Sequence, residues 1–250
     1  MSDEAATAPV VGPEGATWSE DALIRVRGVS KVYRQGELEV PALRGVDLDL
    51  AEGEFTAMAG PSGSGKTTLL NMIGALDSPT EGAVSVAGHD VGTLDRGEAA
   101  DFRLDHVGFI FQAYNLVPVL TAYENAEFTL LLRGTPKEER RERVEGLLER
   151  VGLADMMDRR PPELSGGQQQ RVAIVRALAT HPDIVLADEP TANLDSGTSG
   201  ELLDLMQELN RKLETTFLFS THDETVIRRA RRVIRLLDGR VDRVETRDEA

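Results

Sequence analysis

Apolar and polar positions along this chain alternate with two periods, one typical of strands and one typical of helices. From Leu23 the pattern predicts several short strands, including residues 46–50, where valine and leucine alternate with aspartate. Residues 54–59 then form an apolar strand that runs into a glycine-rich segment. Lys66–Ala75 follows with the spacing of an amphipathic helix. We expect its inner face to consist of Leu69, Leu70 and Ile73.

The middle of the chain is predicted to be mainly helical. Strands are expected at Ala83–Val86 and Val107–Phe111, before a helical stretch from about Ala122 to Met157. Within that stretch Thr135, followed by Pro136 and Glu138, predicts a helix start, because threonine can cap a helix, proline suits its first turn and glutamate favours its positive end. The predicted apolar face of this helix consists of Val144, Leu147, Leu148 and Val151.

Beyond residue 165 strands and helices alternate again. The pattern predicts a helix at 168–179, a strand at Ile184–Ala187, a helix at 199–213, a strand at Thr216–Ser220 and a hairpin that turns at Asp238-Gly239. Strands that alternate with helices predict an α/β fold, in which helices cover both faces of a largely parallel sheet. Ligands of such folds bind at the carboxyl ends of the strands.

The helical stretch interrupts this alternation, so we interpret it as an inserted subdomain. Residues 1–20 and the charged tail at 242–250 lack apolar periodicity and are expected to carry no chemistry and to be disordered. The predicted single domain at 23–240 comprises a core at 23–112 and 169–240 and the helical insertion at about 113–168.

Composition narrows the class of protein. No segment approaches the roughly 18 uninterrupted apolar residues that cross a bilayer, and Met1–Glu4 is acidic where a secretion signal would be basic. We therefore expect a cytoplasmic protein. The net charge of -15 argues against a broad nucleic-acid-binding face, which would gain its affinity from lysine and arginine. With no cysteine, the chain has neither disulfides nor thiolate metal sites.

A glycine-rich segment between the third predicted strand and the following helix carries the strongest chemical signal. It matches the phosphate-binding pattern GxxxxGK[ST] with the residues Gly60, Pro61, Ser62, Gly63, Ser64, Gly65, Lys66 and Thr67. In this pattern backbone N–H groups face the phosphates, Lys66 reaches the outer ones and the Thr67 hydroxyl binds Mg²⁺. Thr68 is expected to add a hydroxyl near the inner phosphate. A plain glycine turn would not account for Lys66.

Asp188 and Glu189 follow the predicted strand Ile184–Ala187 directly. Asp188 would lie where Mg²⁺ bound to phosphates needs a carboxylate, and Glu189 could accept a proton from the attacking water or align it. Alone, such a pair is more often a helix cap or a solvated turn. Its combination with the glycine-rich segment favours the catalytic interpretation.

A second glycine motif opens the helix predicted next. The free N–H groups at a helix start, together with the Ser165 hydroxyl, form an anion-binding surface. Serine followed by glycine is also an ordinary helix cap, and for Ser165 alone that is the better interpretation. The motif consists of Leu164, Ser165, Gly166, Gly167 and Gln168.

These motifs together resemble the nucleotide-binding subunits of ABC transporters over roughly residues 23–240. In that family the second motif is the signature, which closes over ATP held by the opposite subunit. The resemblance implies an ABC cassette of the P-loop NTPase class, with an N-terminal antiparallel β part and an inserted α-helical subdomain. It also implies ATP and Mg²⁺ as cofactors and a head-to-tail homodimer with two ATP molecules between its subunits.

Several further residues match family positions. Gln112 resembles the glutamine that touches Mg²⁺ and the attacking water, and His222 resembles the histidine that contacts the terminal phosphate. Asn193 and Asp195 lie in a segment similar to the loop that crosses the dimer interface. Tyr33 resembles the aromatic residue that stacks on adenine. In isolation Gln112 would be a surface amide, His222 a helix-start residue and Tyr33 a partly buried ring.

The motifs look most like the lipoprotein-releasing and macrolide-export branch. That branch pairs with separately encoded four-helix permeases, so the resemblance implies a peripheral position on the inner face of the membrane. Two alternatives remain open: an ATPase that signals or transmits force without transport, and a soluble repair or translation ATPase. The expected permease-facing segment contains Tyr114, Leu116, Val117, Val119 and Leu120. Packing of the helical insertion on the core explains these apolar residues about as well.

Overall fold

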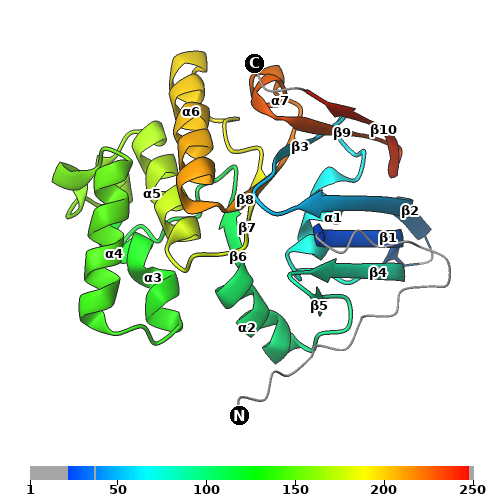
Figure 1. Cartoon of the computed structure of the whole chain (residues 1–250), viewed down its shortest axis with the longest axis horizontal. Helices are drawn as coiled ribbons and strands as arrows, with labels where there is room; N and C mark the ends of the chain where they lie inside the picture. The colour runs from blue at the N-terminus through cyan, green and yellow to red at the C-terminus, as the bar shows by residue number, and fades with distance from the viewer. Residues whose placement is uncertain (1–21, 37, 248–250) are drawn as a thin grey trace, which may run out of the picture.

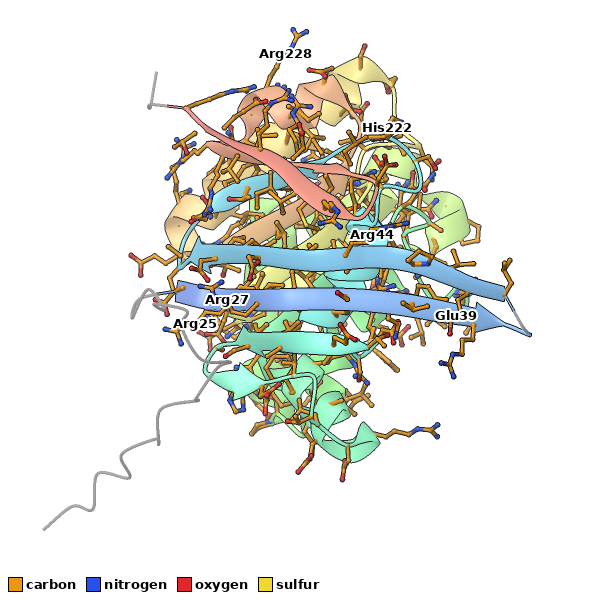
Figure 2. All side chains as sticks on the ribbon, turned by 90° about the vertical axis from the view of Figure 1, so that its right-hand side faces the viewer. Arg25, Arg27, Glu39, Arg44, His222 and Arg228 are labelled. Atoms are coloured by element: carbon orange, nitrogen blue, oxygen red, sulfur yellow. The ribbon has the colours of Figure 1, made fainter. Side chains whose placement is uncertain are left out.

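The computed structural model describes residues 22–36 and 38–247, and contains two sheets. The predictions for residues 1–20 and for the end of the tail lie outside these residues. A four-stranded antiparallel sheet has the order β2-β1-β4-β5 and a six-stranded sheet has the order β10-β9-β3-β8-β7-β6. The smaller sheet comprises β1 (Ala22–Gln35), β2 (Leu38–Ala51), β4 (Glu81–Val86) and β5 (His89–Asp90). Figure 2 views it face-on, with β2, β1 and β4 side by side.

The larger sheet is the parallel core that the sequence predicts. Its strands β9, β3, β8, β7 and β6 are mutually parallel, and only β10 pairs antiparallel at one edge. The strands are β3 (Phe55–Ala59), β6 (Val107–Ile110), β7 (Ile184–Asp188), β8 (Thr216–Thr221), β9 (Arg232–Leu237) and β10 (Arg240–Thr246).

Helices lie on both faces of this sheet (Figure 1). On one face α1 (Lys66–Ile73) lies between the two sheets. The helices grouped on the other side are α3 (Ala122–Leu132), α4 (Lys137–Arg150), α5 (Gly166–Leu178) and α6 (Ser196–Leu213). The remaining helices are α2 (Arg96–His106), α7 (Glu224–Arg229) and the 3₁₀ turns η1 (Ala154–Met156) and η2 (Pro161–Glu163). No helix in the described part of the chain is both long and apolar enough to cross a membrane.

The core strands are buried on both faces because their side chains alternate between two hydrophobic clusters. In β8, Phe217 and Phe219 join the cluster beneath α3, α5 and α6, whereas Leu218 joins the cluster around α1. In β7, Val185 points to the first cluster and Leu186 to the second. This period of two, with apolar residues on both sides, explains why the parallel strands appear in the sequence as continuous apolar segments.

Several predicted elements match closely. Val46, Leu48 and Leu50 of β2 are buried, as their alternation predicts. The predicted inner face of α1 and the apolar face of α4 are also buried. The hairpin turns at Asp238-Gly239, between β9 and β10. The predicted α/β fold with a largely parallel core sheet is therefore confirmed.

Other predictions were wrong in detail. Thr135 does not cap α4: Pro136 occupies the cap position and no side chain bonds the free N–H groups there. The first two strands are 14 residues each, not short, because the two pair with each other along most of their length. Residues 242–246 of the predicted tail belong to β10, since pairing with β9 orders them despite their polar composition. The boundaries of the helical insertion stay a prediction.

The helix starts at α5 and α6 lie two or three residues earlier than predicted. The capping residues determine where these helices begin. Ser165 caps α5 and Asp195 caps α6, so each helix includes the small residues that follow its cap. The sequence pattern gave no indication of α2, in which only Phe102 is buried. A capping box between Asp95 and Glu98 starts this polar helix.

Gly108 in β6 gives a test of how tightly α5 packs on the sheet. A Cβ atom there would lie 2.3 Å from the Ala177 backbone oxygen of α5, too close for any side chain. We expect Gly108→Ala to destabilise the protein by about 1–3 kcal/mol, because either the helix or the strand must move.

Gly146→Ala in α4 is the matched control, since its Cβ would meet nothing within 4 Å. Alanine there should stabilise by about 0.5–1 kcal/mol. Thermal unfolding followed by circular dichroism measures both; equal shifts would contradict the packing argument.

Candidate functional site

The carboxyl ends of the parallel strands bring the predicted phosphate-handling residues to one edge of the sheet. β3 ends at Ala59, directly before the glycine-rich loop, and β7 ends at Asp188. Strand register aligns these ends, because Ala59 pairs with Thr221 of β8 and Asp188 pairs with Ser220. Lys66, Asp188, Glu189 and His222 are thereby gathered at this edge from segments far apart in the sequence.

The glycine-rich loop, residues 60–65, closes on itself around Lys66. The buried Lys66 ammonium donates hydrogen bonds to the carbonyl oxygens of Gly60 at 2.8 Å and Pro61 at 3.0 Å. Gly65 has φ +100°, a left-handed conformation that favours glycine, and begins α1 without any side-chain cap. No acidic residue occupies the first turn of α1. The helix start therefore suits an anion such as a phosphate.

Thr67 and Asp188 bring together oxygen atoms that could ligate a metal ion beside this loop. The Thr67 hydroxyl lies 3.2 and 3.3 Å from the two carboxylate oxygens of Asp188, although 121 residues separate them in sequence. A hydroxyl and a carboxylate are hard oxygen ligands, the type that Mg²⁺ prefers. The donor set thus fits the ion that the sequence predicts here.

Glu189 is held in one orientation by two neighbours from the end of β8. Its Oε2 accepts a hydrogen bond from the Thr221 hydroxyl at 2.9 Å, and its Oε1 lies 2.6 Å from the Nδ1 of His222. Its backbone has φ +46°, unusual for a residue with a side chain. Such a conformation persists only where the surroundings fix it.

A cavity of about 490 Å³ opens beside Glu189 and His222. Thr191, Leu194 and Asp223 line it further. Asp223 accepts a hydrogen bond from the Thr191 hydroxyl at 3.0 Å, so the segments that follow β7 and β8 are joined at the wall of this cavity. Burial acts to raise the pKa of Asp223, but hydrogen bonds from Thr225 and Thr191 outweigh it and hold the pKa below its usual value.

Gln112 lies exposed just beyond β6, with its backbone oxygen accepting a hydrogen bond from the Asn193 amide at 2.7 Å. Asp195 caps α6, accepting bonds from the backbone N–H groups of Gly197 and Thr198 at 3.0 Å each. Hydrogen bonds from Thr198 lower the pKa of Asp195. The segment predicted to cross the dimer interface therefore contacts the backbone of Gln112 within one chain.

The signature motif forms a complete helix start in a different part of the molecule. The Gln168 N–H donates to the Ser165 hydroxyl at 3.3 Å, and the Ser165 N–H donates to the Gln168 side chain at 2.9 Å. Gly166 and Gly167 form the first turn of α5. Figure 1 shows α5 among the helices on one side and α1 between the sheets on the other. The structure does not bring the signature motif together with the glycine-rich loop of the same chain.

Tyr33 lies on β1, and the residue is 37% exposed. Its hydroxyl donates to Asp77 at 2.8 Å, and the Lys31 ammonium lies 5.1 Å from the ring centroid. Thr68, expected near the inner phosphate, has its side chain within hydrogen-bonding reach of the Tyr33 hydroxyl. The ring is thus positioned close to the start of α1, and stacking on adenine stays a prediction.

The apolar segment after Gln112 is only partly exposed. Val117 is 38% and Val119 is 72% exposed, whereas Leu116 packs against the core. Arg176 of α5 holds the start of the segment, donating to the carbonyl oxygens of Tyr114 at 2.8 Å and Asn115 at 2.5 Å.

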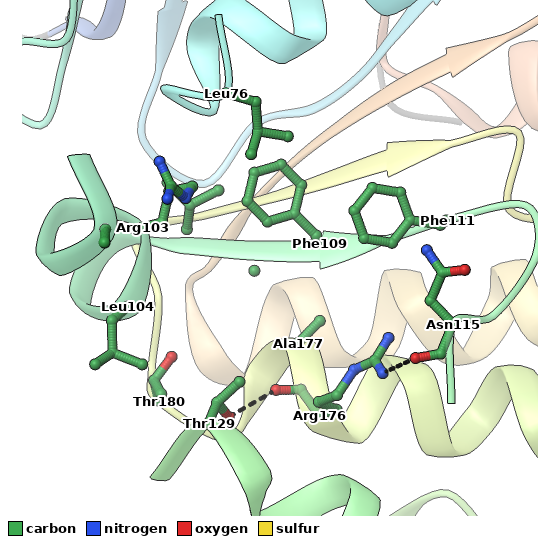
Figure 3. Close-up of a pocket in the computed structure, with 13 residues that line it drawn as sticks. Leu76, Arg103, Leu104, Phe109, Phe111, Asn115, Thr129, Arg176, Ala177 and Thr180 are labelled. Atoms are coloured by element: carbon green, nitrogen blue, oxygen red, sulfur yellow. Dashed lines mark hydrogen bonds between the residues drawn. The ribbon is translucent and has the colours of Figure 1, made fainter. Parts of the chain in front are cut away.

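A cavity of about 380 Å³ adjoins this segment (Figure 3). Phe109 and Phe111 stack side by side along it, with Leu76 beside Phe109. Both arginines that line the cavity, Arg103 and Arg176, come from helices. The cavity is thus lined by two aromatic rings and two arginine side chains.

Three residues of this region were missed by the sequence analysis. Thr221 and Asp223 flank His222 in sequence, and a strand end followed by Thr-His-Asp could have suggested that all three act together. Gln170, which bonds the Pro190 carbonyl, gave no recognisable signal.

Comparisons with known proteins agree with this geometry. A family model described as ABC transporter matches residues 43–192. The lipoprotein-releasing system ATP-binding protein LolD of Anaeromyxobacter dehalogenans is 49% identical over 219 residues, 87% of this chain and 92% of that protein. The macrolide export ATP-binding/permease protein MacB of Hyphomonas neptunium is 47% identical over 88% of this chain, which spans only 34% of that longer protein.

A solved dimeric structure of the ATP-binding cassette MJ0796, in a post-hydrolysis state with ADP and Pi, has a TM-score of 0.83 and 44% identity. That match covers 91% of this chain and 100% of the MJ0796 chain.

The chain belongs to the ABC transporter family. Within it, the chain is an ATP-binding subunit of the LolD/MacB branch and an ATPase, and its fold is the ABC cassette.

Titration of the tyrosines tests the packing around the site. Burial raises the pKa of all three, Tyr33, Tyr114 and Tyr123, and so favours the neutral phenol in the folded state. The stability from these groups is therefore fully present below pH about 10, the value for a free tyrosine, and is lost as the pH rises through the folded pKa values. Absorbance at the tyrosinate band should therefore rise at a higher pH in the folded protein than in the unfolded protein. Identical titration curves for the folded and the unfolded protein would contradict the burial.

Proposed function

We propose that this chain is the ATP-hydrolysing motor of a membrane transporter, working as a head-to-tail homodimer that drives a separately encoded permease. The observation that carries this proposal is the separation of the two phosphate-handling motifs within one chain. The glycine-rich loop before Lys66 leads into α1, which has no side-chain cap, and the signature motif at Ser165 starts α5 with a capping box, yet the two motifs belong to different parts of the molecule. A second copy in head-to-tail orientation would bring Ser165 to the phosphates held at Lys66. Support for a dimer comes from the solved structures of the MJ0796 cassette, which are dimeric.

In this proposal the glycine-rich loop binds the phosphates of ATP. Lys66 exchanges its bonds to Gly60 and Pro61 for the outer phosphates. Thr67, Gln112 and Asp188 would hold Mg²⁺, which neutralises charge that develops on the phosphate oxygens. Tyr33 supplies a ring for the adenine, and Asp195 lies in the loop that faces the second copy.

Glu189 accepts the proton of the attacking water. Thr221 and His222 hold its carboxylate in place, which limits the motion that would otherwise separate it from the water. Because Nδ1 of His222 faces Glu189, its Nε2 is left for the terminal phosphate. The His222 side chain is 71% exposed and so is accessible to a nucleotide or to the second copy. Hydrolysis would then allow the two copies to separate, and this opening and closing would move the permease.

We propose that the transporter is of the export or lipoprotein-release type. In this proposal the protein is peripheral on the inner face of the membrane. Support comes from the relatives: LolD is named for lipoprotein release, and MacB is named as a macrolide exporter that joins an ATP-binding part to a permease. The match to MacB covers 34% of that protein, and the proposal assigns the permease to a separate protein.

Glu189→Gln tests the dimer. The amide cannot accept the proton, so we expect kcat to fall by roughly 10²–10³-fold while ATP binding persists and a stable dimer accumulates. Light scattering after chromatography with ATP and Mg²⁺ measures the mass, and phosphate release measures turnover. Glu208→Gln is the control, because Glu208 is an exposed residue of α6 that forms an ion pair with Lys212, and this variant should hydrolyse normally as a monomer. A Glu189→Gln protein that stays monomeric with ATP would overturn the head-to-tail scheme.

Val119→Asp tests the permease surface. Val119 is 72% exposed in the segment that follows Gln112, so a charge there should leave the fold intact but oppose an apolar contact. We expect the tagged protein to recover an integral membrane protein with four predicted spans from native membranes, and Val119→Asp to recover it at least several-fold less.

The matched control is Val244→Asp on β10, where the valine is 45% exposed at the opposite sheet edge. Both variants should retain the ATP hydrolysis of the isolated protein. Equal recovery by Val119→Asp and Val244→Asp would show that this segment is not the docking surface.

A further inference from the structure

A fully buried glutamine of the signature helix contacts the segment that carries Glu189. Gln170 is 0% exposed, and its Nε2 donates a hydrogen bond of 2.7 Å to the backbone oxygen of Pro190. Gln170 belongs to α5, whose first turn is the signature motif, and Pro190 directly follows Glu189. One hydrogen bond therefore joins the two motifs that the proposed function assigns to different ATP molecules.

The stability of the core does not explain a glutamine at this position. Its second polar atom, Oε1, is buried without a hydrogen-bond partner among the described residues. A buried polar atom without a partner is unfavourable, and an apolar side chain of similar size would avoid that cost. The contact of Nε2 with Pro190 is what the amide provides that an apolar side chain cannot.

The segment at Pro190 is conformationally constrained on both sides. Glu189 has φ +46°, and its N–H donates to the Ser220 oxygen at 2.9 Å. On the far side the Thr191 hydroxyl is bonded to Asp223. Gln170 fixes the carbonyl between these two anchors. A displacement of that carbonyl would rotate the neighbouring peptide and alter the direction of the Glu189 side chain.

The helix provides a rigid connection to the signature motif. Gln170 lies five residues beyond Ser165, which at 1.5 Å per residue is about 7.5 Å along the axis. The capping box closes the N-terminal end of α5, and Val172, Ala173, Ile174 and Val175 are completely buried. A force applied to Ser165 is therefore carried along α5 as a movement of the whole helix.

We propose that Gln170 is a positioning residue that couples the two ATP sites of the dimer. When Ser165 engages the ATP held by the second copy, the shift of α5 passes through the Gln170 amide to Pro190 and sets Glu189 for hydrolysis in its own site. This inference rests on the proposed homodimer. It assigns no chemical step to Gln170, whose amide donates to the Pro190 carbonyl.

Gln170→Met tests the coupling, because methionine keeps the length of the side chain but cannot donate a hydrogen bond. We expect kcat to fall about tenfold with the KM for ATP unchanged, because Glu189 is displaced and the phosphate loop is not. We also expect the Hill coefficient for ATP to fall from above 1 to about 1. Gln170→His, which keeps an N–H donor, should recover part of both. Gln170→Leu replaces the methionine variant if the latter does not fold.

Gln207→Met on α6 is the matched control, since it removes a similar glutamine-to-carbonyl bond, to Arg229 at 3.0 Å, outside the site. It should leave kcat and the Hill coefficient unchanged. A purely structural role for Gln170 would instead lower thermal stability and leave the Hill coefficient of the folded protein unaltered, which would overturn the proposal.

The Glu189→Gln background separates this inference from the proposed function. If Glu189→Gln fails to dimerise with ATP, the proposed dimer is wrong. If it dimerises equally well with and without Gln170→Met, and Gln170→Met alone keeps normal kcat and cooperativity, only the coupling role of Gln170 is wrong.

Discussion

The parallel register of the core sheet is the constraint on which the site depends. Five strands run in the same direction, so their carboxyl ends lie along a single edge. Pairing of Ala59 with Thr221 and of Asp188 with Ser220 sets the glycine-rich loop, the carboxylates and His222 at the same level. A slip of one residue would turn every side chain of the shifted strand to the opposite face, and would remove both the core packing and the site.

This arrangement explains how groups from distant segments can be held rigidly. Thr67 reaches Asp188, and Thr221 reaches Glu189, through short side chains that allow little error in position. The strands beneath them are buried on both faces, so the loops at the edge are supported by a close-packed base. The positions of these side chains are therefore set by the sheet more than by the loops that carry some of them.

The signature helix α5 links the parts of the cassette. Its first turn carries Ser165, its middle contacts Pro190 through Gln170, and its end holds the segment after Gln112 through Arg176. One helix thus contacts the hydrolytic edge and the expected permease-facing segment. The close approach of Gly108 to the Ala177 backbone fixes the same helix against β6.

The sequence by itself determined the fold class and the identity of the phosphate-handling groups. The alternation of apolar segments predicts the parallel core, and the fixed spacing from Gly60 to Thr67 indicates phosphate binding, because both depend on local patterns. The sequence pattern assigned the cap of α4 to Thr135, which was wrong, and it did not predict the polar helix α2. In both places capping and packing outweigh apolar periodicity. Tertiary structure alone decided that Thr221 and His222 hold Glu189, that Asn193 reaches Gln112, and that Gln170 is buried against Pro190. Each of these contacts joins segments brought together by strand order and helix packing, and pairings of this kind leave no periodic trace in the chain.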